Sequence, residues 1–558
     1  METTIPSRKF WRQGEPFVWL TAAALGAIMG LTALLLAVVL YNAIPVFWPA
    51  RVAMVELKDG SRFFGRRVRA QTDPKTDIRS VQFKTANRDL DPQRQDFRWI
   101  NEDDIRQLSW PKEVYVLERM ENGDLYGRLV ELRTPGVEAG SGDARVGLEA
   151  RFDAAMAEID RQDADQLEPI VEELGVLSDR LHAVRYKIFE LGYERAKRLE
   201  KQPRADVSRL AAQVAELAAE EKMIQESSDR LVARQQEILA AVRENVAVFA
   251  DASGATREVA LIDIVRDYRP NDMRLGTKIV HYVAKVWELL TAEPRESNTE
   301  GGLFPAIFGT VMLVFLMAIF CFPLGVLAGI YLGEYAREGP LVRMVRVAVN
   351  NLAGIPSIVY GIFGLGFFVY GVGGLIDRWL YPARLAMENR PTFGTGGILW
   401  ASLTLGLLTV PVVIVATEEA LRTIPRSIRE GSYALGATKF QTLWRVLLPI
   451  GSPGIMTGFI LAMARAAGEV APLMITGVVK IAPDLPVDGN APFFHLDRKF
   501  MHLGFHIYDV GFQSPNVEAS KPMVYVTTLL LLLIVLTMTS VAIGLRNRMR
   551  RRFQSRTI

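Results

Sequence analysis

The stretch EGSYALGATKFQTLWRVLLP, residues Glu430 to Pro449, lies between two apolar segments and does most to decide the fold. Its first part, Glu430 to Leu435, has the composition of a short helix, and Gly436 tolerates a positive φ. The next part predicts a second helix over Thr438 to Leu448 that Pro449 closes. The sequence therefore predicts a rigid elbow of two helices, a shape that suits a docking surface.

Six apolar segments surround this elbow, and each is long enough to cross a bilayer core, which needs about 20 residues per helix. Half of the 558 residues are hydrophobic, yet 23% are charged, so we expect bilayer spans together with a sizeable polar domain. The first segment is longer than the apolar core of a signal peptide, and we expect it to be an anchor. The segments lie near residues 17–41, 303–332, 353–376, 397–417, 455–479 and 523–545.

The distribution of Lys and Arg predicts the orientation, because basic residues are retained on the cytoplasmic side. With the N-terminus inside, the inner segments hold seventeen basic residues, including Arg8, Lys9 and Arg12, and the two short outer loops hold seven. We therefore expect a multi-pass protein of the bacterial inner membrane with both termini and the elbow in the cytoplasm. The stretch 42–300 would lie outside, in the periplasm.

This external stretch contains a weak internal duplication. Val52 to Val68 and Val114 to Val130 each alternate apolar residues around a Gly turn, which predicts two β-hairpins. Asp104-Ile105 and Asp263-Ile264 precede a proline by the same spacing, so each pair closes one of two related β units. We expect the strands of these units over 50–135 and 245–272, with the second unit in two halves.

A helical insertion over 145–245 interrupts the second β unit. Apolar residues recur at heptad spacing before and after a turn at 202–206, which predicts an antiparallel coiled-coil hairpin that projects by about 35 to 50 Å. The hairpin could be a docking arm or a mechanical spacer, and the sequence does not choose between them. The predicted organisation is an N-terminal tail and first span over 1–41, an external domain over 42–300, and a transmembrane domain over 301–558 with a loop at 418–449.

Arg465 lies deep in the fifth apolar segment, where a guanidinium costs roughly 2.5 to 3.5 kcal/mol and needs a partner. Glu469, one helical turn away, supplies that partner. The pair could bind an oxyanion through the planar donors of the guanidinium, or it could be a structural ion pair between spans. Gly468 and Pro472 predict that the helix bends or opens here. Ser357 and Tyr360 are further candidates for polar groups of a pathway.

Other chemistry is not indicated. His495, His502 and His506 lack an acidic cluster, so we expect them to pack rather than bind a metal. The chain contains no G-x-x-x-x-G-K-[ST] loop for nucleotide binding, and its net charge of +3 gives no argument for nucleic acid. We expect no catalytic residue, no metal site and no cofactor in this chain.

These motifs resemble the permeases of ATP-binding-cassette importers, most of all the phosphate-specific permeases of PstA type. In that family the elbow reads EAA, three residues, Gly, nine residues, Ile, one residue, Leu-Pro, and here Gly431 and Ser432 replace the alanines and Val446 replaces Ile. Three further runs resemble the same family over residues 300 to 545, whereas the large external domain departs from it. They are GGLFPAIFGT from Gly301, NNLAGIPSIVYGIFG from Asn350 and ARAAGEVAPLMITG from Ala464.

The resemblance implies a type I importer permease fold with six spans, and passage of phosphate past Arg465 and Glu469. It implies partners as well: a second permease, two cytoplasmic ATPase subunits that hold ATP and Mg²⁺, an external phosphate-binding protein, and membrane lipid. The elbow would dock the ATPases through a set of matching positions: Glu430, Gly431, Ala434, Gly436, Ala437, Leu448 and Pro449. The alternatives are another oxyanion, such as sulfate or molybdate, and a membrane-anchored phosphate-signalling scaffold.

Overall fold

The computed structural model describes residues 14–72, 77–87, 96–135, 144–202, 206–295, 298, 300–388, 390–489, 493–514 and 517–554. The basic residues predicted at the N-terminus, Arg8, Lys9 and Arg12, lie outside the described residues, as do residues 203–205 of the predicted hairpin turn.

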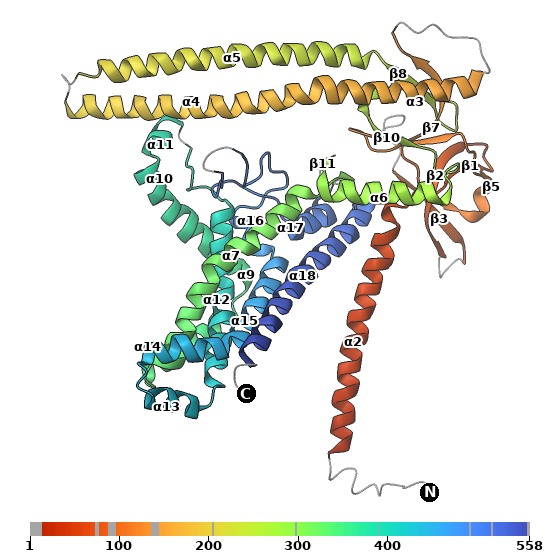
Figure 1. The fold of residues 1–558 in the computed structure, drawn as a ribbon. Coiled ribbons are helices and arrows are strands. Elements are labelled where there is room, and N and C mark those ends of the chain that lie inside the picture. Colours follow the sequence, from red (N-terminus) through yellow and green to blue (C-terminus); the bar gives the residue numbers. More distant parts are fainter. Residues whose placement is uncertain are drawn as a thin grey trace, which may run out of the picture.

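Among the described residues, six helical segments are long and apolar enough to cross a membrane, as predicted. Five of them cluster, while α2 leaves the cluster on its own path below the external domain (Figure 1). The spans are α2 (Glu15–Ala43), α7 (Phe304–Ile330), α9 to α10 (Ser357–Phe363, Gly364–Gly373 and Gly374–Leu380), α12 (Ile398–Arg422), α14 to α15 (Lys439–Thr442, Leu443–Leu447 and Leu448–Gly468) and α18 (Val517–Gln554). Shorter helices are α8 (Pro340–Leu352), α11 (Pro382–Glu388), α13 (Arg426–Ala434), α16 (Ala471–Thr476) and α17 (Leu503–Tyr508).

Helix α12 is the centre of the transmembrane core, because small residues let α7 and α15 approach it closely. A Cβ atom on Gly325 of α7 would lie 2.7 Å from Val413, and one on Gly458 of α15 would lie 2.4 Å from Ala416. Only glycine fits at such contacts between helices. Leu405 of α12 is fully buried in the resulting core.

The fifth span differs from its prediction. It runs from Lys439 to Gly468, so it begins sixteen residues before the predicted start at residue 455 and ends before 479. The predicted helix end at Pro449 is wrong, because the π-helical turn Leu443–Leu447 lets the chain continue with Pro449 in the first turn of α15. Proline is tolerated in the first turn of a helical segment, because an N–H group there has no α-helical partner to lose.

The external domain contains two five-stranded antiparallel sheets with the same strand order. The first is ordered β4-β3-β2-β1-β5, and the second β9-β8-β7-β6-β10. A 3-10 turn precedes the last strand of each, at Glu102–Asp104 and Leu261–Asp263, so the predicted duplication is confirmed. The strands are β1 (Val52–Leu57), β2 (Arg62–Thr72), β3 (Arg79–Lys84), β4 (Phe97–Asn101), β5 (Ile105–Ser109), β6 (Val114–Arg119), β7 (Leu125–Arg133), β8 (Val246–Ala250), β9 (Thr256–Ala260) and β10 (Ile264–Tyr268).

The helical insertion joins β7 to β8 and forms a long arm. It consists of α3 (Ala144–Gln162), a π-helical turn at Asp163–Leu167, α4 (Glu168–Lys201) and α5 (Ser208–Arg243). Helices α4 and α5 pack as a hairpin, with Ile170, Val184, Leu210 and Ile224 buried between them. The hairpin is as expected, and its coiled-coil character stays a prediction.

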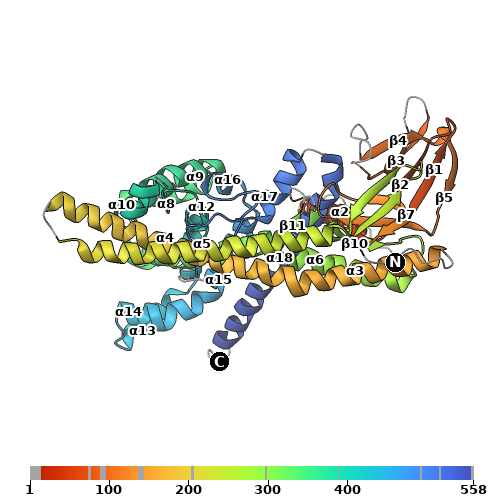
Figure 2. The ribbon, with the colours of Figure 1, turned by 90° about the horizontal axis from the view of Figure 1, so that it is seen from above.

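The arm does not extend away from the membrane domain but lies across its outer end (Figures 1 and 2). Helix α4 contacts α11 there. Tyr186 of α4 interacts electrostatically with Tyr381 and Arg384, and burial at this contact raises the pKa of the Tyr186 hydroxyl. Helix α6 (Leu275–Thr291) and the short strands β11 (Pro294–Arg295) and β12 (Glu300–Gly301) connect the external domain to α7.

Candidate functional site

The predicted pair of Arg465 and Glu469 forms an ion pair, with Arg465 Nε 3.5 Å from Glu469 Oε1. We expected Glu469 to lie on the same helix as Arg465, but α15 ends at Gly468 and Glu469 has extended backbone. The predicted opening is therefore present, and the carboxylate lies at the break before α16. The side chains keep 36% and 23% of their surface exposed, so this face of the core is open.

The depth of Arg465 follows from the packing of α15 on α12. The two helices run antiparallel, because Gly451 approaches Leu421 while Gly458 approaches Ala416. Two further turns along α15 place Arg465 level with the middle of α12. A guanidinium at this depth must face protein or water rather than lipid.

The helix of Ser357 and Tyr360 packs beside this break. A Cβ on Gly361 of α9 would lie 2.8 Å from the Cα of Pro472 in α16, which shows how closely the two helices approach. The hydroxyl of Tyr360 donates to the Leu352 carbonyl at 2.7 Å, and the side chain of Tyr360 packs in the buried cluster that contains Ala466 and Ala467 beside Arg465. Tyr360 is therefore next to the pair, whereas Ser357, in the first turn of α9, is only half-buried.

The elbow has the predicted break. Helix α13 ends at Ala434, and Gly436 has a φ of +82°, which favours glycine. The second helix starts with a capping box, in which Thr438 accepts from the Gln441 N–H and Gln441 accepts from the Thr438 N–H. Glu430, Gly431, Ala434 and Gly436 are exposed on the elbow, Ala437 is half-buried, and Leu448 and Pro449 lie in the first turn of α15.

An exposed apolar edge on this elbow was not predicted. The side chain of Leu435 is 91% exposed, and the rings of Phe440 and Trp444 stack on each other with 65% and 64% exposed. Large apolar side chains gathered at the tip of a helical turn mark a surface for another protein. The sequence offered one signal for this exposure, because Leu435 directly precedes the predicted break at Gly436.

A buried ion pair that fixes the elbow was also missed. Arg429 of α13 pairs with Glu334 at 2.5 Å, and it also donates to the carbonyls of Ile424 and Leu421 at 2.6 and 2.7 Å. Glu334 lies in the π-helical turn Tyr331–Tyr335 that ends α7. The elbow is thus fastened to the first helix of the core, and no local sequence signal connects residues 95 positions apart.

The histidines considered for a metal site make other contacts. His502 caps α17 by accepting the Gly504 N–H, and His506 contacts the Asn298 carbonyl and the Thr527 hydroxyl. Burial lowers the pKa of both histidines to about 4. Within the described residues no group of three potential metal ligands is found.

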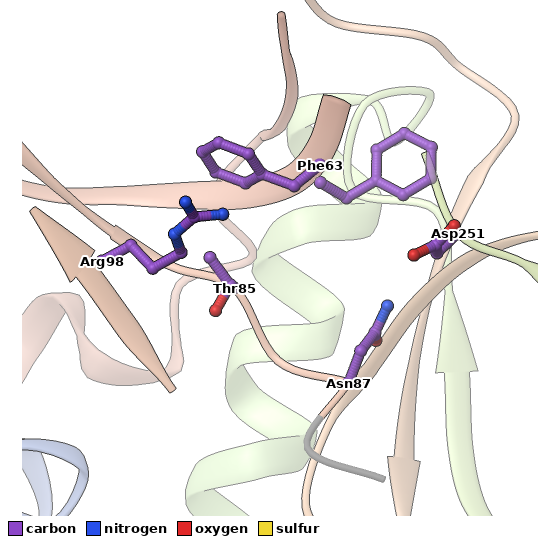
Figure 3. Close-up of a pocket in the computed structure, with 6 residues that line it drawn as sticks. Phe63, Thr85, Asn87, Arg98 and Asp251 are labelled. Carbon is purple, nitrogen blue, oxygen red and sulfur yellow. The ribbon is translucent and has the colours of Figure 1, made fainter. Parts of the chain in front are cut away.

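A small pocket lies in the external domain where the two sheets meet (Figure 3). Asn87 holds the main chain of Tyr126 through two hydrogen bonds, and the Arg98 guanidinium lies 5.1 Å from the Phe63 ring. The hydrogen bonds of Asn87 join the two sheets, and the contact of Arg98 with Phe63 lies within the first sheet, so the pocket serves the fold. It is lined by Phe63, Phe64, Thr85, Asn87, Arg98 and Asp251.

Comparison with known proteins shows the family to which the membrane core belongs. The family described as "Binding-protein-dependent transport system inner membrane component" matches residues 325–554, which include the elbow and Arg465. The probable ABC transporter permease protein YqgI of Bacillus subtilis is 30% identical over 240 residues, 42% of this chain and 74% of that protein. The chain belongs to this permease family. It is therefore a multi-pass membrane protein.

The permease is also similar to two further relatives. The phosphate transport system permease protein PstA of Mycobacterium leprae is 37% identical over 175 residues, 31% of this chain and 51% of that protein. The probable ABC transporter permease protein YqgH of B. subtilis is 34% identical over 206 residues, 36% of this chain and 62% of that protein. The permease thus spans about half to three fifths of the length of these two relatives.

Proposed function

We propose that the chain is a permease subunit of an ATP-driven importer that moves inorganic phosphate across the bacterial inner membrane. The observation that carries this proposal is the partly exposed Arg465–Glu469 pair at the break between α15 and α16. The similarity to relatives named as phosphate transport permeases supports the choice of phosphate. Both termini and the elbow lie in the cytoplasm, and the external domain lies in the periplasm.

The chemistry of the pair suits phosphate. The guanidinium of Arg465 offers planar, paired donors that match two oxygens of a tetrahedral anion. Glu469 orients the guanidinium and can accept a proton from a protonated phosphate, whereas sulfate and molybdate carry no such proton at neutral pH. Tyr360 and Ser357 are the further polar groups of the pathway.

The proposed complex contains a second permease, two cytoplasmic ATPase subunits and an external phosphate-binding protein. The ATPase subunits hold ATP and Mg²⁺ and dock on the elbow, with Leu435 and the stacked Phe440 and Trp444 as the apolar contact. Because α14, the π-helical turn and α15 form one continuous helix from Lys439 to Gly468, a movement of the elbow is transmitted directly toward Arg465. Alternate exposure of the Arg465 region then follows from a rocking movement of this helix.

Uptake measurements test the substrate. Cells that lack the chain and receive it back should recover uptake of labelled phosphate, and excess sulfate or molybdate should not compete. Competition by either anion would favour the wider oxyanion reading. Recovery of phosphate-dependent signalling without any uptake would favour the scaffold reading and contradict the proposal.

Copurification tests the docking surface. Leu435→Asp and Glu430→Ala should reduce the amount of ATPase that copurifies with the chain. Met223→Asp is the matched control, because Met223 is also a large, exposed apolar residue but lies on the external arm, with 62% of its surface exposed. If the ATPase copurifies equally with all three variants, the elbow is not its docking site.

A further inference from the structure

Helix α6 (Leu275–Thr291) exposes its apolar side chains and turns its charged side chains inward. Val280 and Trp287 are 69% and 67% exposed. Apart from the adjacent Ile279 and Val280, the exposed apolar residues are three or four positions apart, so they form one stripe along the helix. They are Leu275, Ile279, Val280, Val283, Trp287 and Leu290.

The opposite face of α6 is polar and is occupied by the external domain. Lys285 pairs with Glu118 of β6 at 2.8 Å, and Glu288 pairs with Arg266 of β10 at 3.0 Å. Glu288 also accepts from Arg295 at 2.7 Å. A helix on a water-facing surface would show the reverse arrangement, with its charges outside. The surroundings of the apolar stripe are therefore not water.

The position of α6 identifies those surroundings. Leu289 of α6 packs in one cluster with Ala43 at the end of α2, Ala306 in the first turn of α7 and Met523 near the start of α18. Helix α6 thus lies at the level where three spans reach the outer end of the membrane domain, and it runs across them (Figure 1). Apolar side chains of these spans are exposed as well, among them Ile44 at the end of the first span and Phe315 in α7.

Aromatic residues of the same region fit an interface between lipid and water. The ring of Trp48, just after α2, lies 6.2 Å from the ring of Tyr282 on α6. Trp287 projects from the exposed stripe, and Tyr41 is 81% exposed at the end of α2. Trp and Tyr gather at this level in membrane proteins, because the headgroup region suits an apolar ring with a polar edge.

We propose that α6 is an interfacial helix that binds the bilayer surface on the side of the external domain, with its stripe among the upper acyl chains. Charged side chains of its other face hold β6 and β10, so lipid contact fixes the height of the β sheets. The arm, which grows from the second sheet, is thereby held parallel to the membrane and above its outer end. This inference does not depend on which anion is transported.

Fluorescence quenching in lipid nanodiscs tests the proposal with the full-length chain. Val283→Cys carries a bimane label on the stripe, and Ala218→Cys carries the same label on the exposed face of the arm. The unmodified chain measures labelling of Cys321, which is buried. Lipids with a doxyl group at acyl carbon 5 should quench the Val283 label more than about twofold better than the Ala218 label. Aqueous iodide should show the opposite order.

Two results would overturn the proposal. Equal quenching of both labels by iodide would mean that the stripe faces water. Protection of the Val283 label from both quenchers would mean that a protein covers it. Ala284→Cys, a smaller change at a neighbouring exposed position, keeps the test available if Val283→Cys does not fold.

Discussion

The ion pair between Arg429 and Glu334 should hold the elbow in place, and Glu334→Ala tests this directly. The carboxylate is 9% exposed and the guanidinium 17%, so the pair is buried. Removing one partner of a buried pair costs about 3 to 5 kcal/mol. We expect the lower end, about 3 kcal/mol, because Arg429 keeps its hydrogen bonds to the carbonyls of Ile424 and Leu421. Since about 1.4 kcal/mol is tenfold, this raises the undocked fraction of the elbow roughly a hundredfold.

Hydrogen exchange of α13 in the reconstituted chain measures this undocking. Its amides should exchange roughly a hundredfold faster in Glu334→Ala, by the same conversion. Glu338→Ala is the matched control, because Glu338 also pairs with an arginine but is 66% exposed, and such pairs contribute about 0 to 1 kcal/mol. The double variant E334A/R429A should exchange no faster than E334A. Unchanged exchange in Glu334→Ala, or an equal change in Glu338→Ala, would refute the reasoning.

Three further predictions concern stability. Gly436→Ala should destabilise the elbow by about 1 to 2 kcal/mol, because the φ of Gly436 is +82°. Gly436→Asn should destabilise it less, and hydrogen exchange of the elbow amides measures both effects. Gly364→Ala should lower the unfolding temperature, because its Cβ would lie 2.2 Å from Thr404 Oγ1, whereas Gly366→Ala has free space and should not. Burial lowers the pKa of His506 from 6.5 to about 4, so the unfolded state alone takes up the proton between these values. Stability should therefore fall as pH decreases from 6.5 to 4, and His506→Gln should make this fall less steep by up to about 1.4 kcal/mol per pH unit.

The sequence predicted the parts of the fold that local patterns control. Apolar length was sufficient to predict that six spans exist, although not for the bounds of the fifth. The two Gly turns after Val52 and Val114 were sufficient for the duplicated hairpins. Gly436 correctly marked the break of the elbow, because a residue with positive φ is readable from its type. Heptad spacing correctly paired the helices of the arm.

The sequence failed where a local rule was overridden or where the contact is distant. Proline normally ends a helix, but a π-helical turn before Pro449 lets the helix continue. No residue type in this stretch predicts such a turn. The contact of Arg429 with Glu334 depends on how α7 meets α13, which the order of residues does not reveal. The arm was expected to project, but α4 contacts α11. This contact depends on the angle between the β sheet and the membrane core, which local sequence patterns do not show.

Phosphate uptake by Arg465→Ala tests the central claim most directly. The complex is reconstituted in proteoliposomes with its ATPase and binding protein, and uptake is compared with Arg465→Lys, which keeps the charge but loses the paired donors. A hydrogen bond to a charged group is worth about 1.5 to 3 kcal/mol, so Arg465→Ala should lower phosphate uptake about 10- to 150-fold while the complex still assembles and hydrolyses ATP. Arg465→Lys should fall between it and the unmodified chain. Normal phosphate uptake by Arg465→Ala would contradict the proposed pathway.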